Sequence, residues 1–496
     1  MEHRLHLTGD PVSLDPLACY RALETRDARF DGRLFVGVTS TRIYCRPICP
    51  ARTAKFVHCR FYPSAAAAQE AGFRPCLRCR PETAPELGAW HGTSNTVSRG
   101  LALIAEGALD GEDASVDDLA SRLGIGERQL RRLFKEHLGA SPIAVAQARR
   151  VHFAKQLIHD TDLPMTEVAA AAGFGSLRRF NECFQMLYRR PPGALRRRAP
   201  THQLADGVTL RLPYRPPYDW PTMLGFLAAR AIPGMEGVAG DRYIRAIALD
   251  GKAGTIEIGH LPARHSLAVT IRFPNLRALP AIVRRIRRVF DLGADVTMIG
   301  AQLADDPLLG PMIAARPGLR VPGGWDGFEL AIRAILGQQI TIAAARKLGQ
   351  QLVALCGGAV PANAHGLTHC FPTPLQLLAS DLDILGMPGA RRQALIAMAE
   401  AAAADPDLFQ ARGSIEETVA RLRDIRGIGD WSAHYIALRV VRESDAFPAS
   451  DIGLLRGATP PGGTRPTPKE LAAMAEAWRP WRAYAAQHLW AADPAI

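Results

Sequence analysis

The chain has 496 residues, 48% of them hydrophobic, and a formal net charge of +12 at pH 7. This length predicts three or four domains that each bury a core, and the basic excess favours an acidic partner, most often nucleic acid. We find no apolar run long enough to cross a membrane and no secretory signal, so we expect a cytoplasmic protein.

Two pairs of cysteines near the start of the chain predict a metal site. Cys45 and Cys49 are separated by three residues, and Cys76 and Cys79 by two. Four thiolates suit tetrahedral Zn²⁺, and the other cysteines show no pairing rhythm that would indicate a disulfide frame. The spacing alone leaves two interpretations open. The site is either purely structural, or one zinc-bound thiolate also reacts as a nucleophile.

The residues around these cysteines carry a resemblance. The stretches FVGVTSTRIYCRPICPAR (35–52) and FYPSAAAAQEAGFRPCLRCRP (61–81) look like the zinc domain of the bacterial adaptive-response (Ada) family. In that family the first cysteine of the motif, which matches Cys45, accepts a methyl group from a methylphosphotriester in DNA. The resemblance implies one Zn²⁺ on four cysteines, with Cys45 reactive. Methylation would remove a negative charge and so strengthen binding to the phosphate backbone.

Three arginines flank the cysteines and are candidates for holding that phosphate group. They are Arg46, Arg74 and Arg78. A guanidinium group suits this role because it donates paired hydrogen bonds to phosphate oxygens.

The next part of the chain predicts two helix-turn-helix units. The first reads as a helix capped by Ser115, a turn at Gly124 and a second helix near 127–136. The second repeats the plan, with a turn at Gly173 and a second helix near 176–184. Two such units resemble the AraC-type DNA-binding domain, although a helical hairpin with a solvated basic face is the alternative. The side chains expected to contact DNA here are Arg128, Arg131, Arg132, Arg178 and Arg179.

A change of pattern follows. Between residues 208 and 270, runs such as YIRAIAL and GTIEIGHL predict strands, joined by a hairpin turn at DGKAG. Beyond Pro307 the Ala- and Leu-rich segments have helical spacing.

The stretch LRDIRGIGDWSAHYIALR (422–439) contains a G-x-G hairpin between two helices. Gly427 and Gly429 would let backbone N–H groups approach a phosphate, although alone they also fit a turn in a helical bundle. Asp451 follows soon after, and this arrangement resembles the helix-hairpin-helix DNA glycosylases. The stretches LPYRPPYDWPTMLGFLAARAIPGMEGV, ILGQQITIAAA and WRPWRAYAAQHLW look like 3-methyladenine DNA glycosylase II, the AlkA family, from about residue 210 onward.

This second resemblance implies removal of an alkylated base that has been flipped out of the DNA stack. The Asp451 carboxylate would stabilise the positive charge that builds on the sugar and orient a water. Aromatic faces would hold a cationic base. No lysine stands beside Asp430 in the hairpin, so water rather than an amine is the expected nucleophile of a monofunctional glycosylase. The aromatic residues that match the family's pocket are Trp431, Tyr435 and Trp490, with Tyr218 as a further candidate.

One departure concerns the residue that fills the gap left by the flipped base. The family has an apolar wedge directly after the glutamine that matches Gln338, but here that place holds Gln339. The wedge is therefore either polar or supplied by Ile340. We expect both glutamines to contact DNA.

Together these features predict a multidomain, mainly α protein with α+β parts. The expected domains are a zinc domain at 1–88, a double helix-turn-helix domain at 89–200, an α+β subdomain at 206–300 and a helix-hairpin-helix bundle at 301–496. The expected function is excision of alkylated bases combined with methylphosphotriester sensing and transcriptional control. Two alternatives are a transcription regulator with a non-catalytic glycosylase fold and a glycosylase with a purely structural zinc domain.

The expected partners are double-stranded DNA, both alkylated and promoter DNA, and RNA polymerase. We expect a monomer in the bacterial cytoplasm, associated with the nucleoid.

Overall fold

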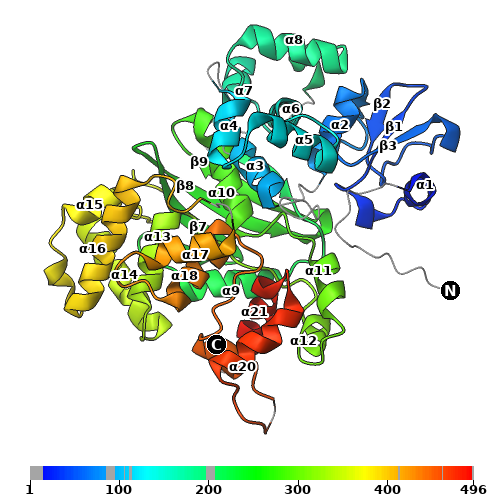
Figure 1. The fold of residues 1–496 in the computed structure, drawn as a ribbon. Helices are drawn as coiled ribbons and strands as arrows, with labels where there is room; N and C mark the ends of the chain where they lie inside the picture. Colours follow the sequence, from blue (N-terminus) through cyan, green and yellow to red (C-terminus); the bar gives the residue numbers. More distant parts are fainter. Residues whose placement is uncertain are drawn as a thin grey trace. The chain divides into compact units, whose positions relative to one another are not determined.

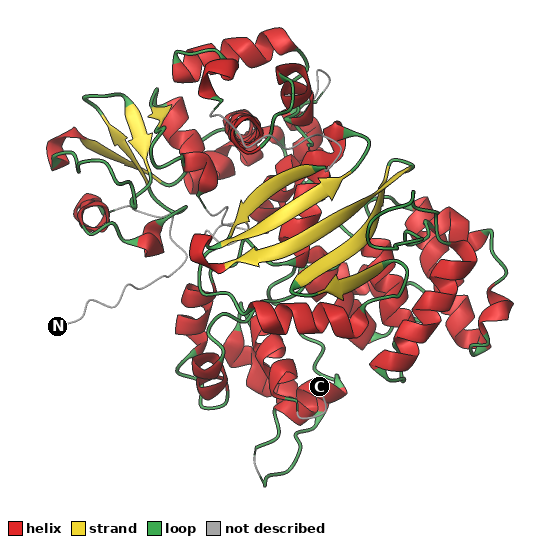
Figure 2. Cartoon of the chain, turned by 180° about the vertical axis from the view of Figure 1, so that it is seen from behind, coloured by secondary structure: helices red, strands yellow, loops and turns green. Residues whose placement is uncertain are grey.

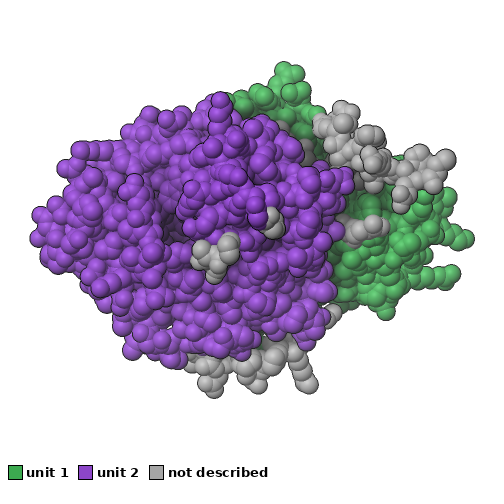
Figure 3. All heavy atoms as spheres, turned by 90° about the horizontal axis from the view of Figure 1, so that it is seen from below, with its two compact units in different colours: residues 1–213, 275–284 green, residues 214–274, 285–496 purple. Residues whose placement is uncertain are grey.

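The computed structural model describes residues 15–84, 95–105, 107–110, 114–196, 207–410, 414–460 and 462–493. The chain divides into two compact units, one of residues 1–213 with 275–284 and the other of residues 214–274 with 285–496 (Figure 3). The mainly helical architecture with α+β parts, predicted from the sequence, is confirmed, and the strands form two sheets.

The domain boundaries expected from the sequence can be compared with the helices and strands only where the structure describes the chain. The boundary at 88–89 and the gap at 201–205 lie outside the described residues. The boundary at 300–301 falls inside helix α11 (Val296–Leu303).

The cysteine-rich part of unit 1 is a small sheet between short helices. Its elements are α1 (Pro16–Glu24), β1 (Phe35–Val38), β2 (Ile43–Cys45), β3 (Cys59–Tyr62), α2 (Ala65–Glu70) and β4 (Arg74–Pro75). The strand order is β3-β1-β2-β4, and only the β2–β4 pair is parallel. Successive strand residues face opposite sides, so Phe35 and Val36 enter two different buried clusters.

The helical part of unit 1 contains both predicted helix-turn-helix pairs, α4–α5 and α7–α8 (Figure 1). Its elements are α3 (Asn95–Ala105), α4 (Val116–Arg122), α5 (Glu127–Leu138), α6 (Pro142–Asp160), α7 (Met165–Ala171), α8 (Leu177–Tyr188) and the strand β5 (Val208–Pro213). Ser115 and Ser176 cap α4 and α8 through their side-chain oxygens. Gly124 and Gly173 take positive φ angles of 70° and 80°, which allow the tight turns.

Unit 2 begins with an antiparallel sheet, the larger of the two groups of yellow strands in Figure 2. Its elements are α9 (Trp220–Arg230), β6 (Glu236–Ala239), β7 (Arg242–Leu249), β8 (Lys252–Leu261) and β9 (Ser266–Arg272), followed by α10 (Leu279–Val289), which crosses the division between the units. The predicted hairpin is confirmed. Asp250 and Gly251 have φ angles of 48° and 71°, as a two-residue turn with both residues left-handed requires.

The remainder of unit 2 is helical. After α11 come α12 (Leu309–Ala315), α13 (Gly327–Leu336), α14 (Ile342–Cys356), α15 (Pro374–Leu378), α16 (Gly389–Ala404), α17 (Ile415–Arg423), α18 (Asp430–Ile436), the π-helical turn η9 (Ala437–Val441), α19 (Ile452–Gly457), α20 (Pro468–Ala475) and α21 (Arg482–Ala492). Within the described ranges, no helix combines the length and the apolar character needed to span a bilayer.

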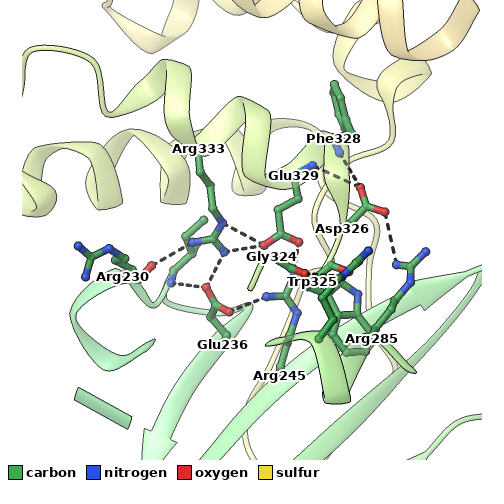
Figure 4. A network of polar contacts seen from close by, with 12 residues as sticks. Arg230, Glu236, Arg245, Arg285, Gly324, Trp325, Asp326, Phe328, Glu329 and Arg333 are labelled. Carbon is green, nitrogen blue, oxygen red and sulfur yellow. Dashed lines mark hydrogen bonds and ion pairs between the residues drawn. The ribbon is translucent and has the colours of Figure 1, made fainter. Parts of the chain in front are cut away.

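A buried ionic network fastens α13 to the sheet (Figure 4). Arg245 of β7 lies between Glu236 of β6 and Glu329 of α13, and its guanidinium is 5.3 Å from the Trp325 ring centroid. Arg333, one turn further along α13, donates to both carboxylates. Leaving one of these buried charges without its partner would be costly, so this network fixes the direction of α13 and the start of the loop that follows it.

Candidate functional site

The four predicted metal ligands lie together in unit 1. The Sγ atoms of Cys45, Cys49, Cys76 and Cys79 are all within 4.8 Å of one another. The pairing of β2 with β4 brings the two cysteine pairs together, because Cys45 ends β2 and Cys76 follows β4 directly. Zinc bonded to four sulfurs at about 2.3 Å would hold the sulfurs about 3.8 Å apart, so these donors fit the ion.

Backbone amides point at two of these sulfurs. The N–H of Arg46 donates to Cys79 Sγ, and the N–H of Arg78 donates to Cys76 Sγ, both at 3.4 Å. Such donors favour thiolate over thiol. Cys45 is half-buried, whereas the other three cysteines are at most 8% exposed. Cys45 is therefore the ligand that a molecule in solvent can reach most easily.

The flanking arginines differ in what they can do. The Arg46 guanidinium is buried in an ion pair with Asp31 and also donates to the Cys79 carbonyl oxygen at 3.1 Å. It therefore braces the metal site and is not available to a phosphate, contrary to our expectation. Arg74 donates to the Thr41 carbonyl oxygen at 3.3 Å. Arg78 is exposed next to the cluster.

A buried joint connects the cysteine-rich part to the helical part within unit 1. The Lys155 ammonium of α6 lies 2.8 Å from the Glu82 carboxylate, and neither side chain is exposed. Burial alone would raise the pKa of Glu82, but Lys155 and Arg80 hold that pKa below its usual value. Beside this pair, the Tyr44 hydroxyl lies 3.0 Å from Nε2 of His152 on α6. Because Tyr44 directly precedes Cys45, the joint begins at the metal site.

The predicted DNA-contacting arginines of unit 1 are all exposed. Arg128, Arg131 and Arg132 lie on α5, and Arg178 and Arg179 lie on α8. Two of them pair with carboxylates one helical turn away on the same helix, at Glu127 and Glu182. Exposed pairs of this kind are weak and exchange readily with solvent or phosphate.

In unit 2, Asp451 is held by four N–H groups. It caps α19, where its Oδ1 accepts from the amides of Gly453 (2.9 Å) and Leu454 (3.1 Å). The same oxygen accepts from the indole of Trp490 at 2.8 Å, and Oδ2 accepts from the indole of Trp431 at 2.6 Å. The carboxylate is half-buried, so a fixed negative charge stands at the edge of the aromatic group.

Three of the four predicted pocket aromatics meet around Asp451. The rings of Trp431 and Tyr435 stack with centroids 5.3 Å apart and planes at 15°. Trp490 meets Tyr435 edge-on, with centroids 6.1 Å apart. These residues come from α18 and α21, which lie far apart in the sequence.

Tyr218 does not join this group. Its hydroxyl donates to the Phe290 carbonyl oxygen at 2.8 Å, and its ring packs against Tyr214 and beneath the Arg320 guanidinium. Burial raises the pKa of Tyr218 above its usual value. These contacts account for the position of Tyr218, which is therefore not part of the proposed pocket.

Two further residues, Arg439 and Phe226, lie beside these rings and were not predicted from the sequence. The Arg439 guanidinium lies 4.8 Å from the Trp490 ring centroid, 5.5 Å from that of Tyr435 and 4.7 Å from that of Phe226. The spacing of four residues between Tyr435 and Arg439 indicates a shared helix face. No local signal marks Phe226, which lies on α9.

The hairpin before α18 has one constrained glycine and one free glycine. Gly427 has a φ of +85°, and a Cβ there would come within 2.3 Å of the Ala394 Cβ. Gly429 caps α18 with an extended backbone, and a Cβ there would meet nothing within 4 Å. Gln338 braces the hairpin, because its side-chain amide donates to the Gly427 carbonyl oxygen and to Ser432 Oγ, both at 3.0 Å.

Gln339, at the wedge position, is exposed and has a φ of +59°. Left-handed backbone at a residue other than glycine is uncommon and costs energy. The side chain of Gln339 is therefore presented at the tip of the loop, whereas Ile340 is only half-exposed.

Comparison with known families matches successive parts of the chain. The models are the metal binding domain of Ada at residues 18–82, a helix-turn-helix domain at 119–198, the AlkA N-terminal domain at 209–326 and the HhH-GPD superfamily base excision DNA repair protein at 332–483.

Individual relatives agree with these matches. A probable bifunctional transcriptional activator/DNA repair enzyme AlkA from Mycobacterium tuberculosis is 39% identical over 477 residues, which is 95% of each chain. DNA-3-methyladenine glycosylase 2 of Escherichia coli is 37% identical over 282 residues, covering 56% of this chain and 95% of the relative. The structure of a 3-methyladenine DNA-glycosylase from Archaeoglobus fulgidus shares the fold at 22% identity, with a TM-score of 0.51 over 57% of this chain and 97% of that one. The chain thus belongs to the family of bifunctional transcriptional activators and DNA repair enzymes that join Ada-type regulatory domains to an AlkA-type glycosylase.

Proposed function

We propose that this chain removes alkylated bases of the 3-methyladenine type from DNA and also reports methylation of the DNA backbone to transcription. The observation that carries the first activity is the Asp451 carboxylate, fixed by two indole N–H groups beside stacked aromatic rings. A neutral asparagine at this position would lack the negative charge that stabilises a sugar cation, and a carboxylate without these hydrogen bonds would not be held in place.

The glycosylase reaction breaks the bond between C1′ and the base nitrogen. Both bonding electrons leave with the base, and positive charge builds on the sugar. The Asp451 carboxylate stabilises that charge and accepts a proton from the water that adds to C1′. The rings of Trp431, Tyr435 and Trp490 hold the flipped base by stacking.

The hairpin before α18 and the loop after α13 bind the DNA and hold the base in its flipped position. The backbone amides around Gly427 and Gly429 approach a phosphate, and Gln338 fixes the hairpin from behind. Gln339 enters the duplex where the base has left. The side chain there is polar, so it fills the gap with hydrogen-bonding groups as well as bulk.

The methyl-transfer step takes place at Cys45. Its sulfur attacks the methyl carbon of a methylphosphotriester, an S–C bond forms, and the C–O bond breaks with its electrons passing to the phosphate oxygen. Zinc held by the four cysteines would keep the attacking sulfur in its thiolate form. The support is the fit of the four sulfurs to that ion and the greater exposure of Cys45.

The transferred methyl group acts as a transcriptional signal. It lowers the negative charge at the metal site, so unit 1 binds DNA more tightly, with α5 and α8 in successive major grooves of a promoter. RNA polymerase is the partner that reads this state. We further propose that the chain works as a monomer in the cytoplasm, at the nucleoid.

The test of the glycosylase proposal is release of free base from methylated duplex DNA. Asp451→Asn keeps the size and the helix cap but removes the charge, so we expect at least about a hundredfold loss of rate. Asp381→Asn is the matched control, because Asp381 also caps a helical turn in unit 2 but accepts no indole hydrogen bond within the described part of the chain. Full base release by Asp451→Asn would contradict the proposal and favour a non-catalytic, DNA-binding role for the fold.

A further inference from the structure

Arg439 is a buried cation without a carboxylate partner in the part of the chain that the structure describes. The residue is 2% exposed. One terminal nitrogen donates to the Pro322 carbonyl oxygen at 2.9 Å, while Nε has no hydrogen-bond partner among the described residues. Burial lowers the pKa of Arg439 to about 10, which still leaves the side chain charged at neutral pH. An unpaired buried charge destabilises the folded protein, which suggests that Arg439 has a functional role.

This guanidinium is surrounded by three aromatic rings, two of which belong to the proposed base pocket. Its centroid distances are 4.8 Å to Trp490, 5.5 Å to Tyr435 and 4.7 Å to Phe226. Contact with aromatic faces offsets part of the burial cost. The residue also lies in the π-helical turn η9, and such irregularities are frequent at functional sites.

The aromatic group therefore has a fixed charge of each sign. The Asp451 carboxylate accepts from the indole N–H of Trp490, and the Arg439 guanidinium lies over the ring of the same residue. The anion stands where the sugar would become positive, and the cation stands beside the rings that would hold the base.

Breaking the C1′–N bond moves an electron pair from the sugar to the base. A neutral purine leaves as an anion, which a nearby cation stabilises, before it takes a proton from solvent. A base that alkylation has made cationic leaves as a neutral molecule, and before cleavage the same cation repels it. Arg439 therefore lowers the barrier to cleavage for a neutral base and weakens the binding of a cationic base.

We infer that Arg439 is a specificity-determining residue of the base pocket, which supports departure of neutral damaged purines and opposes binding of cationic ones. This inference rests on the proposed glycosylase function. In the transition state the base carries about half of a full charge. With the guanidinium about 7 Å from that charge and an effective dielectric constant of about 20, their interaction changes the rate of base release about tenfold.

The test compares kcat/KM for two duplexes that differ in one nucleotide, either the cationic 7-methylguanine or the neutral hypoxanthine. Arg439→Met removes the charge and keeps an unbranched side chain. We expect kcat/KM for hypoxanthine to fall about tenfold or more relative to that for 7-methylguanine. Arg439→Lys retains the charge and should restore most of the original ratio.

Two further variants separate this role from a structural one. Arg439→Gln is a second uncharged variant that keeps a donor for the Pro322 carbonyl oxygen and is used if Arg439→Met melts at a markedly lower temperature. Arg320→Met is the matched control, because Arg320 is equally buried over tyrosine rings outside the proposed pocket. This substitution should change kcat/KM for hypoxanthine and for 7-methylguanine by the same factor.

The outcomes are distinct. An equal change of both rates in Arg439→Met and Arg439→Gln would overturn the inference and leave the glycosylase proposal intact. Release of the cationic base alone by the unmodified chain would also overturn it. Release of neither base by the unmodified chain would overturn the proposed function, and the inference with it.

Discussion

At the scale of single residues, the geometry around Asp451 depends on its two indole donors. Both are tryptophans that also supply ring faces to the proposed pocket. Each indole therefore both stacks and donates a hydrogen bond. A substitution by phenylalanine removes the hydrogen bond but keeps a smaller aromatic face.

Trp490→Phe should slow base release without abolishing it. A hydrogen bond to a charged group contributes about 1.5–3 kcal/mol, so we expect a loss of rate of roughly tenfold to a hundredfold. The measurement is single-turnover release of 3-methyladenine from methylated duplex DNA. Trp478→Phe is a matched control, because the Trp478 indole donates at 2.7 Å to Asp306, outside the pocket. Equal losses of activity in the two variants would show that the Asp451 hydrogen bond has no special role.

At this scale the sequence is most informative where a residue belongs to a motif. The resemblance assigns Asp451, Trp431, Tyr435 and Trp490 to one site, and the structure brings these four side chains together, while their roles stay predictions. Tyr218 was named on the same basis but packs elsewhere, because its neighbours along the chain do not reveal which way its ring turns. The spacing of four residues from Tyr435 indicates that Arg439 shares its helix face, but no sequence pattern shows that this arginine is buried without a carboxylate partner, because buried arginines are normally paired.

At the scale of elements, the hairpin before α18 depends on the backbone of one glycine. Gly427 combines a positive φ with close contact to Ala394, whereas Gly429 has neither constraint. This contrast makes the two glycines a natural pair for comparison.

Gly427→Ala should destabilise the helical part of unit 2. A left-handed backbone at alanine costs roughly 1–2 kcal/mol, and the clash with Ala394 adds to this. The free energy of unfolding from urea titration should therefore fall for Gly427→Ala and stay nearly unchanged for Gly429→Ala. Comparable stabilities for the two variants would mean that the hairpin relaxes around the new methyl group.

Element boundaries followed from local chemistry, but the links between elements did not. The cap at Ser115 and the turn at Gly251 could be predicted, because each depends on residues within one turn of the chain. The network that holds α13 to the sheet was not predicted. Its partners, Glu236 and Glu329 among them, are brought together only by the tertiary fold.

At the scale of the whole molecule, the chain carries two chemistries in two compact units. The thiols of Cys45, Cys49, Cys76 and Cys79 belong to unit 1, and the carboxylate and indoles around Asp451 belong to unit 2. Fold class and family followed from the sequence because several motifs agreed in order along the chain. Reactivity at Cys45 did not follow, because spacing is the same for a structural and a reactive zinc site.

The most direct measurement treats the zinc-loaded full chain with methylated duplex DNA and analyses one tube in two ways. Intact mass with peptide mapping reports methyl uptake, and chromatography reports free bases. Cys356→Ser, a change at a half-buried thiol outside the cluster, serves as the control for Cys45→Ser. We predict one added methyl group on Cys45, lost in Cys45→Ser but not in Cys356→Ser, together with released alkylated base in every case. An unchanged protein mass alongside free bases would contradict the account and leave the four cysteines as a structural site in front of a glycosylase.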